Sequence, residues 1–64
     1  MKPYTITISH YEQVLSEGQV EAGSIEHARV KAIHVIRDFK QRPLDINVIP
    51  SWDGDRHELN EHID

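Results

Sequence analysis

The chain has 64 residues, no cysteine and a formal net charge of −4. This length allows one small domain, and without cysteine that domain has neither a disulfide nor a thiolate metal site to stabilise it. Hydrophobic residues make up 38% and charged residues 28%, which favours a folded domain over a disordered chain. No apolar run is long enough to cross a membrane and no signal-peptide pattern is present, so we expect a cytoplasmic protein.

The negative charge is concentrated near the C-terminus. Residues 1–50 contain six basic and six acidic side chains, so their charges cancel. Residues 51–64 contain five acidic side chains and one arginine, which accounts for the whole excess of −4. Such a chain is poorly suited to bind phosphate backbones, but it is suited to bind a basic surface, including one that normally holds nucleic acid.

Two strands are expected before residue 23. Residues 4–10 alternate between β-branched or aromatic and polar residues, which predicts a half-buried strand with Tyr4, Ile6 and Ile8 facing the core. Residues 19–22 predict a second, shorter strand with Val20 and Ala22 facing inward. Residues 12–17 have no clear period, so we expect a connection longer than a two-residue turn.

One amphipathic helix is expected over residues 24–40. Ser24 is a good N-cap, and Arg42-Pro43 predicts that the helix has ended by that point. On a helical wheel the apolar residues share one sector about 100° wide, which is typical of a helix that packs on a sheet. They are Ile25, Ala28, Ala32, Val35, Ile36 and Phe39.

Residues 44–49 alternate again and predict a third strand with Leu44, Ile46 and Val48 facing inward. A right-handed crossover from the second strand would place the third strand beside the first. The predicted fold is therefore α+β: a three-stranded antiparallel sheet of β-β-α-β order, 2-1-3, with one helix on one face. We expect a domain over residues 1–50 and an acidic polar tail over residues 51–64.

No catalytic or metal site is predicted. In the tail, the segment His57-Glu58-Leu59-Asn60-Glu61-His62 places its second histidine one residue out of register with a zinc-protease helix. The serines lie in no nucleophile motif, and the glycines form no phosphate-binding loop. We expect a protein that is not an enzyme and uses no cofactor or metal.

Two surfaces are candidates for partner binding. Val30 and Ile33 fall outside the apolar sector of the helix, close to Arg37, and could form a contact site on its outer face. Trp52 is expected either to close the end of the core or to contact a partner, with the core role favoured. The acidic tail is the second candidate surface, and its members are Asp53, Asp55, Glu58 and Glu61.

The strand-to-helix junction at residues 17–32 resembles one found in small phage-encoded β-β-α-β proteins. The resemblance rests on Val20-Glu21-Ala22-x-Ser24, followed by alanine at helical spacing at positions 28 and 32. Proteins of this kind include anti-CRISPR inhibitors that block the DNA-binding face of a type I interference complex. The resemblance implies a small inhibitor or adaptor that works by protein contact, and it assigns no functional residue.

The leading hypothesis is a small interaction protein that binds and blocks a larger protein or complex that handles nucleic acid. The alternative is a nucleic-acid-binding module that uses the uncovered sheet face with Tyr11 and the basic residues Arg37, Lys40 and Arg42. The alternative is rated lower because sheet-based readers stack bases on exposed aromatic rings, and this face offers at most one. Self-association through the sheet face or a strand edge is compatible with either hypothesis.

Overall fold

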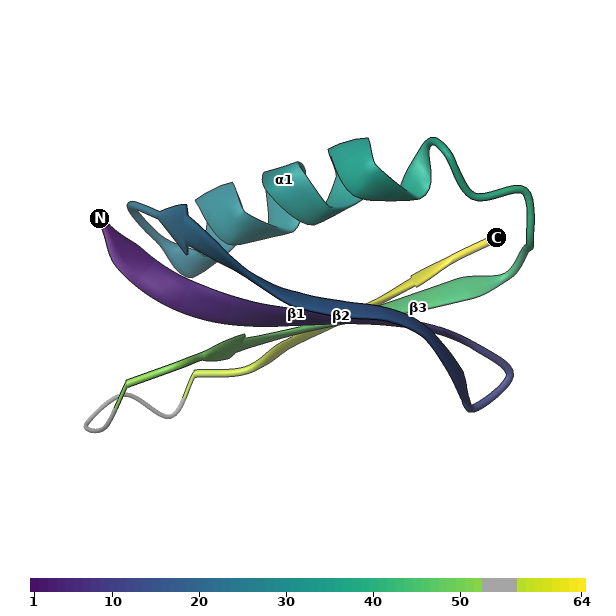
Figure 1. The fold of residues 1–64 in the computed structure, drawn as a ribbon, viewed down its shortest axis with the longest axis horizontal. Coiled ribbons are helices and arrows are strands. Elements are labelled where there is room, and N and C mark those ends of the chain that lie inside the picture. Colours follow the sequence, from purple (N-terminus) through teal and green to yellow (C-terminus); the bar gives the residue numbers. More distant parts are fainter. Residues whose placement is uncertain (53–56) are drawn as a thin grey trace.

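The computed structural model describes residues 1–52 and 57–64, in which one helix lies across one face of an antiparallel sheet (Figure 1). The sheet has four strands in the order β2-β1-β3-β4. In chain order the elements are β1 Lys2–His10, β2 Gln13–Ala22, α1 Ile25–Ile36, β3 Leu44–Pro50 and β4 Leu59–Ile63. The α+β class and the order of the first three strands are confirmed, whereas the expected number of strands was wrong.

The fourth strand comes from the segment that was expected to be a polar tail. β4 pairs antiparallel with β3, with Leu59 opposite Val48 and Ile63 opposite Leu44. Between these two apolar residues, Glu61 lies opposite Ile46 on the face that α1 covers. A charged residue at this inward position interrupts the apolar alternation, and for that reason the sequence did not reveal the strand.

β1 and β2 form a tight hairpin, and the longer connection expected from the sequence was wrong. Only Tyr11 and Glu12 separate the strands, with φ angles of 47° and 69°. Two successive residues with positive φ characterise the type I′ turn, whose twist matches that of a hairpin. A register shift between Ile8 and Ser9 then leaves Val14 exposed while Leu15 packs against the core.

The inward-facing residues of the first three strands are confirmed. Tyr4, Ile6 and Ile8 of β1 are buried together with Leu44, Ile46 and Val48 of β3, while Ala22 of β2 is buried and Val20 packs against this cluster. From the helix, the buried residues are Ala28, Ala32 and Ile36. The two alanines have no bulky side chain, so the helix backbone can approach the sheet closely.

α1 begins as expected and ends earlier than expected. The Ser24 hydroxyl caps it by accepting a hydrogen bond from the His27 N–H at 3.2 Å. The helix ends at Ile36, because the N–H groups of Asp38 and Phe39 donate to carbonyl groups only three residues back. Phe39 therefore lies beyond the helix, although it still packs against the core.

The burial of two helix residues is the reverse of what the helical wheel predicted. Ile33 was expected on the outer face and packs against the core, whereas Val35 was expected in the core and is 43% exposed. β4 widens the sheet beyond β3, and the helix flank that carries Arg29 contacts it. Ile33 lies one turn after Arg29 on the same flank, which places it over the widened sheet.

An ion pair links α1 to β4. The Arg29 guanidinium lies 2.8 Å from Oε1 of Glu61, and both side chains are about one-third exposed or less. The second carboxylate oxygen of Glu61, Oε2, is buried and has no hydrogen-bond partner among the described residues. Arg29 therefore compensates a carboxylate that would otherwise be costly to place between helix and sheet.

We expect Arg29→Ala to lower the free energy of unfolding by about 1–2 kcal/mol, because it leaves the Glu61 carboxylate without its charged partner. Urea denaturation measures this change. Replacing both residues by leucine should restore part of the loss, since no unpaired carboxylate then remains. Arg37→Ala, which removes an exposed arginine at the C-cap, is the matched control. Equal effects of the two arginine substitutions would contradict the role of the pair.

We expect Glu12→Gly to raise the free energy of unfolding by about 1 kcal/mol, because glycine adopts positive φ without the steric cost of a Cβ atom. Thermal unfolding followed by circular dichroism measures the change. Gln13→Gly, one residue further on within β2, should instead destabilise the fold, since no positive φ is required there. A loss of stability in Glu12→Gly would contradict the turn conformation.

Candidate interaction surface

The side of the sheet that α1 does not cover is polar, and we call it the open face. Cross-strand pairs place Thr7 beside both Glu17 and Asn47, and Asn47 beside Asn60. Further along the strands, Ser9 lies beside Asp45 and Asp45 lies beside His62. Other members of the open face are Thr5, Gln19, Ile49 and Glu58, and the exposed Val14 lies opposite Ser9.

The open face is concave where β1, β3 and β4 meet. A hollow of about 330 Å³ is lined there by the side chains of Ser9, Asp45, Asn47, Asn60 and His62, together with Ile46 and Glu61 of β3 and β4. Hydroxyl, carboxylate, amide and imidazole groups thus surround one depression. Such a set of groups is suited to hydrogen-bond a polar or cationic side chain.

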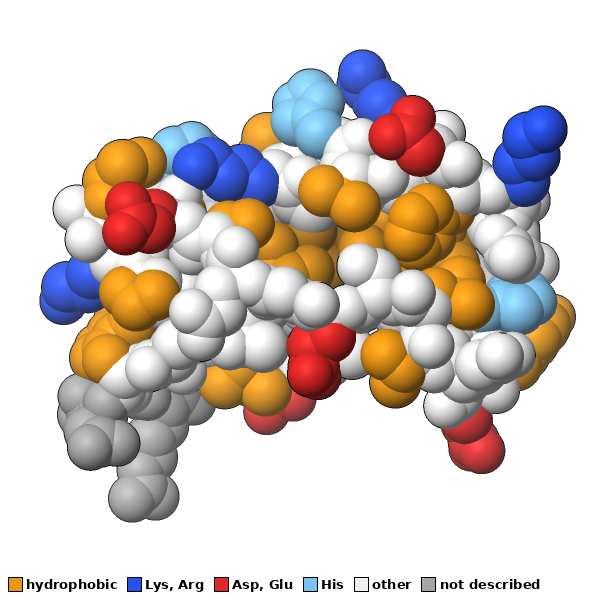
Figure 2. Space-filling view, viewed as in Figure 1, with side chains coloured by type: hydrophobic (Ala, Val, Ile, Leu, Met, Phe, Trp, Pro, Cys, Tyr) orange, Lys and Arg blue, Asp and Glu red, His pale blue; other side chains and the backbone are white. Residues whose placement is uncertain are grey.

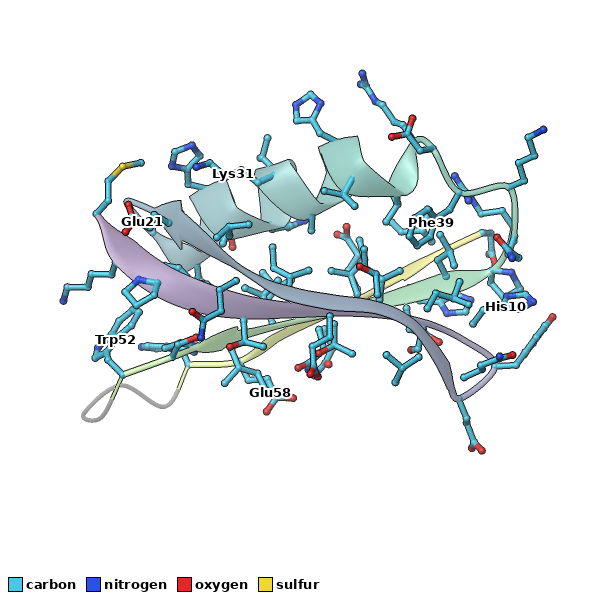
Figure 3. All side chains as sticks on the ribbon, viewed as in Figure 1. His10, Glu21, Lys31, Phe39, Trp52 and Glu58 are labelled. Carbon is cyan, nitrogen blue, oxygen red and sulfur yellow. The ribbon has the colours of Figure 1, made fainter. Side chains whose placement is uncertain are left out.

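Two amides and a carboxylate form a network beside this hollow. The Asn47 amide nitrogen donates to Glu58 Oε1 at 2.8 Å and also to the Asn60 side-chain oxygen. Asn60 in turn donates to the same Glu58 oxygen at 3.1 Å. Donation from Asn47, and then from Asn60, stabilises the charged carboxylate and lowers the pKa of Glu58. Figure 3 shows Glu58 on the side of the sheet away from α1.

His62 lies between two carboxylates. Its Nδ1 is 2.7 Å from Asp45 Oδ1, and its Nε2 is 3.1 Å from Asp64 Oδ1. The hydrogen bond to Asp45 is the main reason that the pKa of His62 is raised, and Asp64 adds to it. Ser9, Asp45 and His62 are the residue types of a hydrolytic triad, but Asp45 lies between the other two and Nε2 contacts a carboxylate. The imidazole is therefore not placed to activate the serine hydroxyl.

Basic side chains lie elsewhere in the described part of the chain. Arg29 pairs with Glu61, Lys2 lies 5.0 Å from the centre of the Trp52 ring, and Lys31 reaches the Glu21 carbonyl of β2. Arg37, Lys40 and Arg42 follow the end of the helix. In the view of Figure 2, blue side chains occupy the helix side and the ends, while red ones lie both beside them and along the lower edge, where no blue one is seen. The open face is therefore the acidic side of the described structure.

The structure separates the residues that were predicted to bind a partner. Val30 is exposed on the outer helix face and Arg37 is the exposed C-cap residue, but Ile33 packs against the core. Trp52 packs edge-on against Tyr4 with ring centres 5.0 Å apart, as expected for its core role. Glu58 lies on the open face, and Glu61 pairs with Arg29. Asp53 and Asp55 lie outside the described residues.

Of the residues that line the hollow, only Glu61 was predicted as a site residue. The predicted inward positions 44, 46 and 48 imply that Asp45 and Asn47 point away from the core, but the sequence does not show which residues lie beside them. Asn60 and His62 were placed in the acidic polar tail. The available signal was the spacing of Leu59 and Ile63 at alternate positions on either side of Asn60 and His62, which is compatible with a half-buried strand.

Comparison with known proteins finds no matching family model, no matching curated protein and no matching solved structure. Within residues 1–52 and 57–64, no three His, Asp or Glu side chains gather in a way that could hold a metal ion. Across the same residues, no helix has the length and apolar character to cross a bilayer. What this chain can bind is therefore inferred from the geometry of the open face.

We expect the pKa of His62 to lie above the ordinary value of about 6.5, and Asp45→Asn to lower it. A raised pKa means that the folded state binds the proton more tightly, so this contribution to stability is complete below about pH 6.5 and is lost as pH rises through the folded-state pKa. An NMR titration of the His62 ring measures the pKa directly. Asp64→Asn, which removes the weaker partner, should have a smaller effect. Equal effects, or none, would contradict the leading role of Asp45.

Proposed function

We propose that this protein is a non-enzymatic interaction protein of the cytoplasm that binds and blocks a basic surface of a larger, nucleic-acid-handling protein. The observation that supports this proposal is the open face, which presents carboxylates and amides and no lysine or arginine among the described residues. Glu17, Asp45 and Glu58 distribute negative charge from β2 to the start of β4. A basic partner would find complementary charge across the whole face.

The chemistry of the open face favours a partner site that normally binds nucleic acid. Such sites use arginine and lysine to contact phosphate oxygens, and carboxylate oxygens accept the same charge-assisted hydrogen bonds. The network of Asn47 and Asn60 holds the Glu58 carboxylate in place, so less side-chain freedom is lost on binding. The face would then compete with nucleic acid for one site, as the resemblance to phage-encoded inhibitors implies.

Direct nucleic-acid binding by this face is less well supported. Its described residues include no Phe, Tyr or Trp on which a base could stack. Tyr11, which was considered for this role, lies in the β1–β2 turn with its ring 4.5 Å from that of His10. Arg37 is the C-cap of α1 and Lys40 lies in the segment that follows it, which leaves the helix on the side of the sheet that α1 covers (Figure 1). We therefore propose protein binding alone.

Titration of the labelled protein with a synthetic arginine-rich peptide tests the proposal. We expect NMR amide shifts at Asp45, Asn47 and Asn60, and binding that weakens by about two- to tenfold in the double variant Asp45→Asn/Glu58→Gln. The matched control is Glu26→Gln/Asp38→Asn, which removes the same charge from the helix side. Shifts confined to the helix side, or equal weakening by both variants, would overturn the proposal. Salt-sensitive binding of duplex DNA would overturn it in favour of the nucleic-acid-binding module.

A further inference from the structure

β2 forms a long free edge of the sheet. It has ten residues, whereas the strand at the opposite edge, β4, has five. An edge strand presents a row of unpaired N–H and C=O groups, and proteins commonly protect it with charged side chains (lysine above all), proline, a β-bulge or a short length. β2 contains neither lysine nor proline, and its bulge, at Leu15, leaves residues 16–22 as a regular edge. This edge is therefore a surface to which another strand could add.

The pairing inside the sheet determines which groups of β2 face outward. The Ser51 N–H donates to the Pro3 carbonyl, so the backbone groups of Pro3 point toward β3. Successive residues of a strand point their backbone groups alternately to its two neighbours. Odd-numbered residues of β1 therefore bond to β3, and even-numbered residues bond to β2. The partners of Tyr4, Ile6 and Ile8 in β2 are Val20, Gly18 and Ser16. The backbone groups of Glu17, Gln19 and Glu21 therefore point to the free edge.

One of these three residues is already engaged. The Lys31 side chain donates a hydrogen bond to the Glu21 carbonyl and so covers the last part of the edge. Figure 3 labels Lys31 on α1 and Glu21 near the end of β2. Glu17 and Gln19 remain as the outward-facing residues in the regular part of β2. They flank Gly18 on either side.

Gly18 has no role within one chain that requires glycine. It has no positive φ, and a Cβ atom added there would meet nothing within 4 Å. Glycine weakens a strand interior and often marks the close approach of another backbone. In an antiparallel pair, the residues that are not bonded to each other have the closer Cα atoms, about 4.5 Å apart. Gly18 is such a position on the free edge.

We propose that a second copy of this chain pairs with β2 antiparallel to itself, on a two-fold axis at Gly18. Glu17 of each copy then lies opposite Gln19 of the other, in a bonded pair whose carboxylate and amide side chains are complementary. Opposed residues must share a face, so the other registers within two residues are centred on Glu17, Gln19, Val20 or Ser16, and the last of these opposes Glu17 to Leu15 at the bulge. The first two oppose Glu17 to Glu17 or to Glu21, and the third requires the Glu21 edge that Lys31 covers.

The two helices do not obstruct this pairing. Because α1 contacts β1, β2 and β3, it is centred over β1. Three strand spacings separate β1 of one copy from β1 of the other, about 14 Å, which exceeds the helix diameter of about 10 Å. Both helices lie on one side of a continuous eight-stranded sheet, and both open faces lie on the other. This dimer does not depend on the proposed partner.

Hydrogen exchange and sedimentation over a range of protein concentrations test the pairing. We expect a monomer–dimer equilibrium in which the N–H groups of Glu17 and Gln19 become protected as concentration rises, while that of Gly18 is protected throughout. A protein that remains monomeric at NMR concentrations would overturn the proposal. So would a dimer in which Glu17 and Gln19 exchange at the monomer rate.

Charge variants test the register. Gln19→Glu places two carboxylates opposite each other on each side of the axis, so we expect it to weaken the dimer about tenfold. The control Gln13→Glu adds the same charge to β2 away from the axis, and we expect it to leave the dimer unchanged. The exchange Glu17→Gln/Gln19→Glu restores complementarity at the same net charge, and we expect it to restore the dimer. Failure of the exchange to do so, in a protein with an unchanged circular dichroism spectrum, would overturn the Gly18 register. The peptide titration of Asp45→Asn/Glu58→Gln is unaffected by either result.

Discussion

A single helix of 12 residues has to cover the inner face of four strands, and the rest of the structure follows from this constraint. Ala28 and Ala32 allow the helix to approach the sheet closely over its middle, where Ile8, Ile46 and Val48 are fully buried. On the flank of the helix that faces β4, Ile33 packs against the core and Arg29 lies one turn before it. Arg29 and Glu61 occupy that flank, and a charged pair is acceptable there because both side chains keep partial contact with water.

The same constraint leaves the other side of the sheet uncovered, so its residues must be compatible with water. Threonine, serine, asparagine and acidic residues fulfil that need, and they also hydrogen-bond across strands. The links from Asp45 to His62 and from Asn47 to Asn60 and Glu58 add side-chain bonds to the pairing of β3 with β4. A face that only needed to be soluble would carry both signs of charge. The absence of lysine and arginine among the described residues of this face therefore supports the proposed binding of a basic partner.

Much of the fold could be predicted because its elements carry strong local signals. Alternation in residues 4–10 and 44–49, the Ser24 cap and the apolar sector of the helix were sufficient for the order of three strands and for their inward residues. The burial of Ile33 and the exposure of Val35 could not be predicted, because a helical wheel contains no information on the width of the sheet on which the helix packs. The tight turn at Tyr11 and Glu12 was also missed, because neither residue is the glycine or asparagine that usually marks positive φ.

The sequence by itself determined the secondary-structure order and the apolar side of each of the first three strands, since these follow from the periods of strand and helix. Only the tertiary structure decided that the C-terminal segment pairs with β3. That pairing depends on Arg29, 32 residues before Glu61, neutralising a carboxylate that local analysis assigns to solvent. It also brings Asp45, Asn47, Asn60 and His62 to one hollow, because side chains from different strands become neighbours only when the register of those strands is fixed.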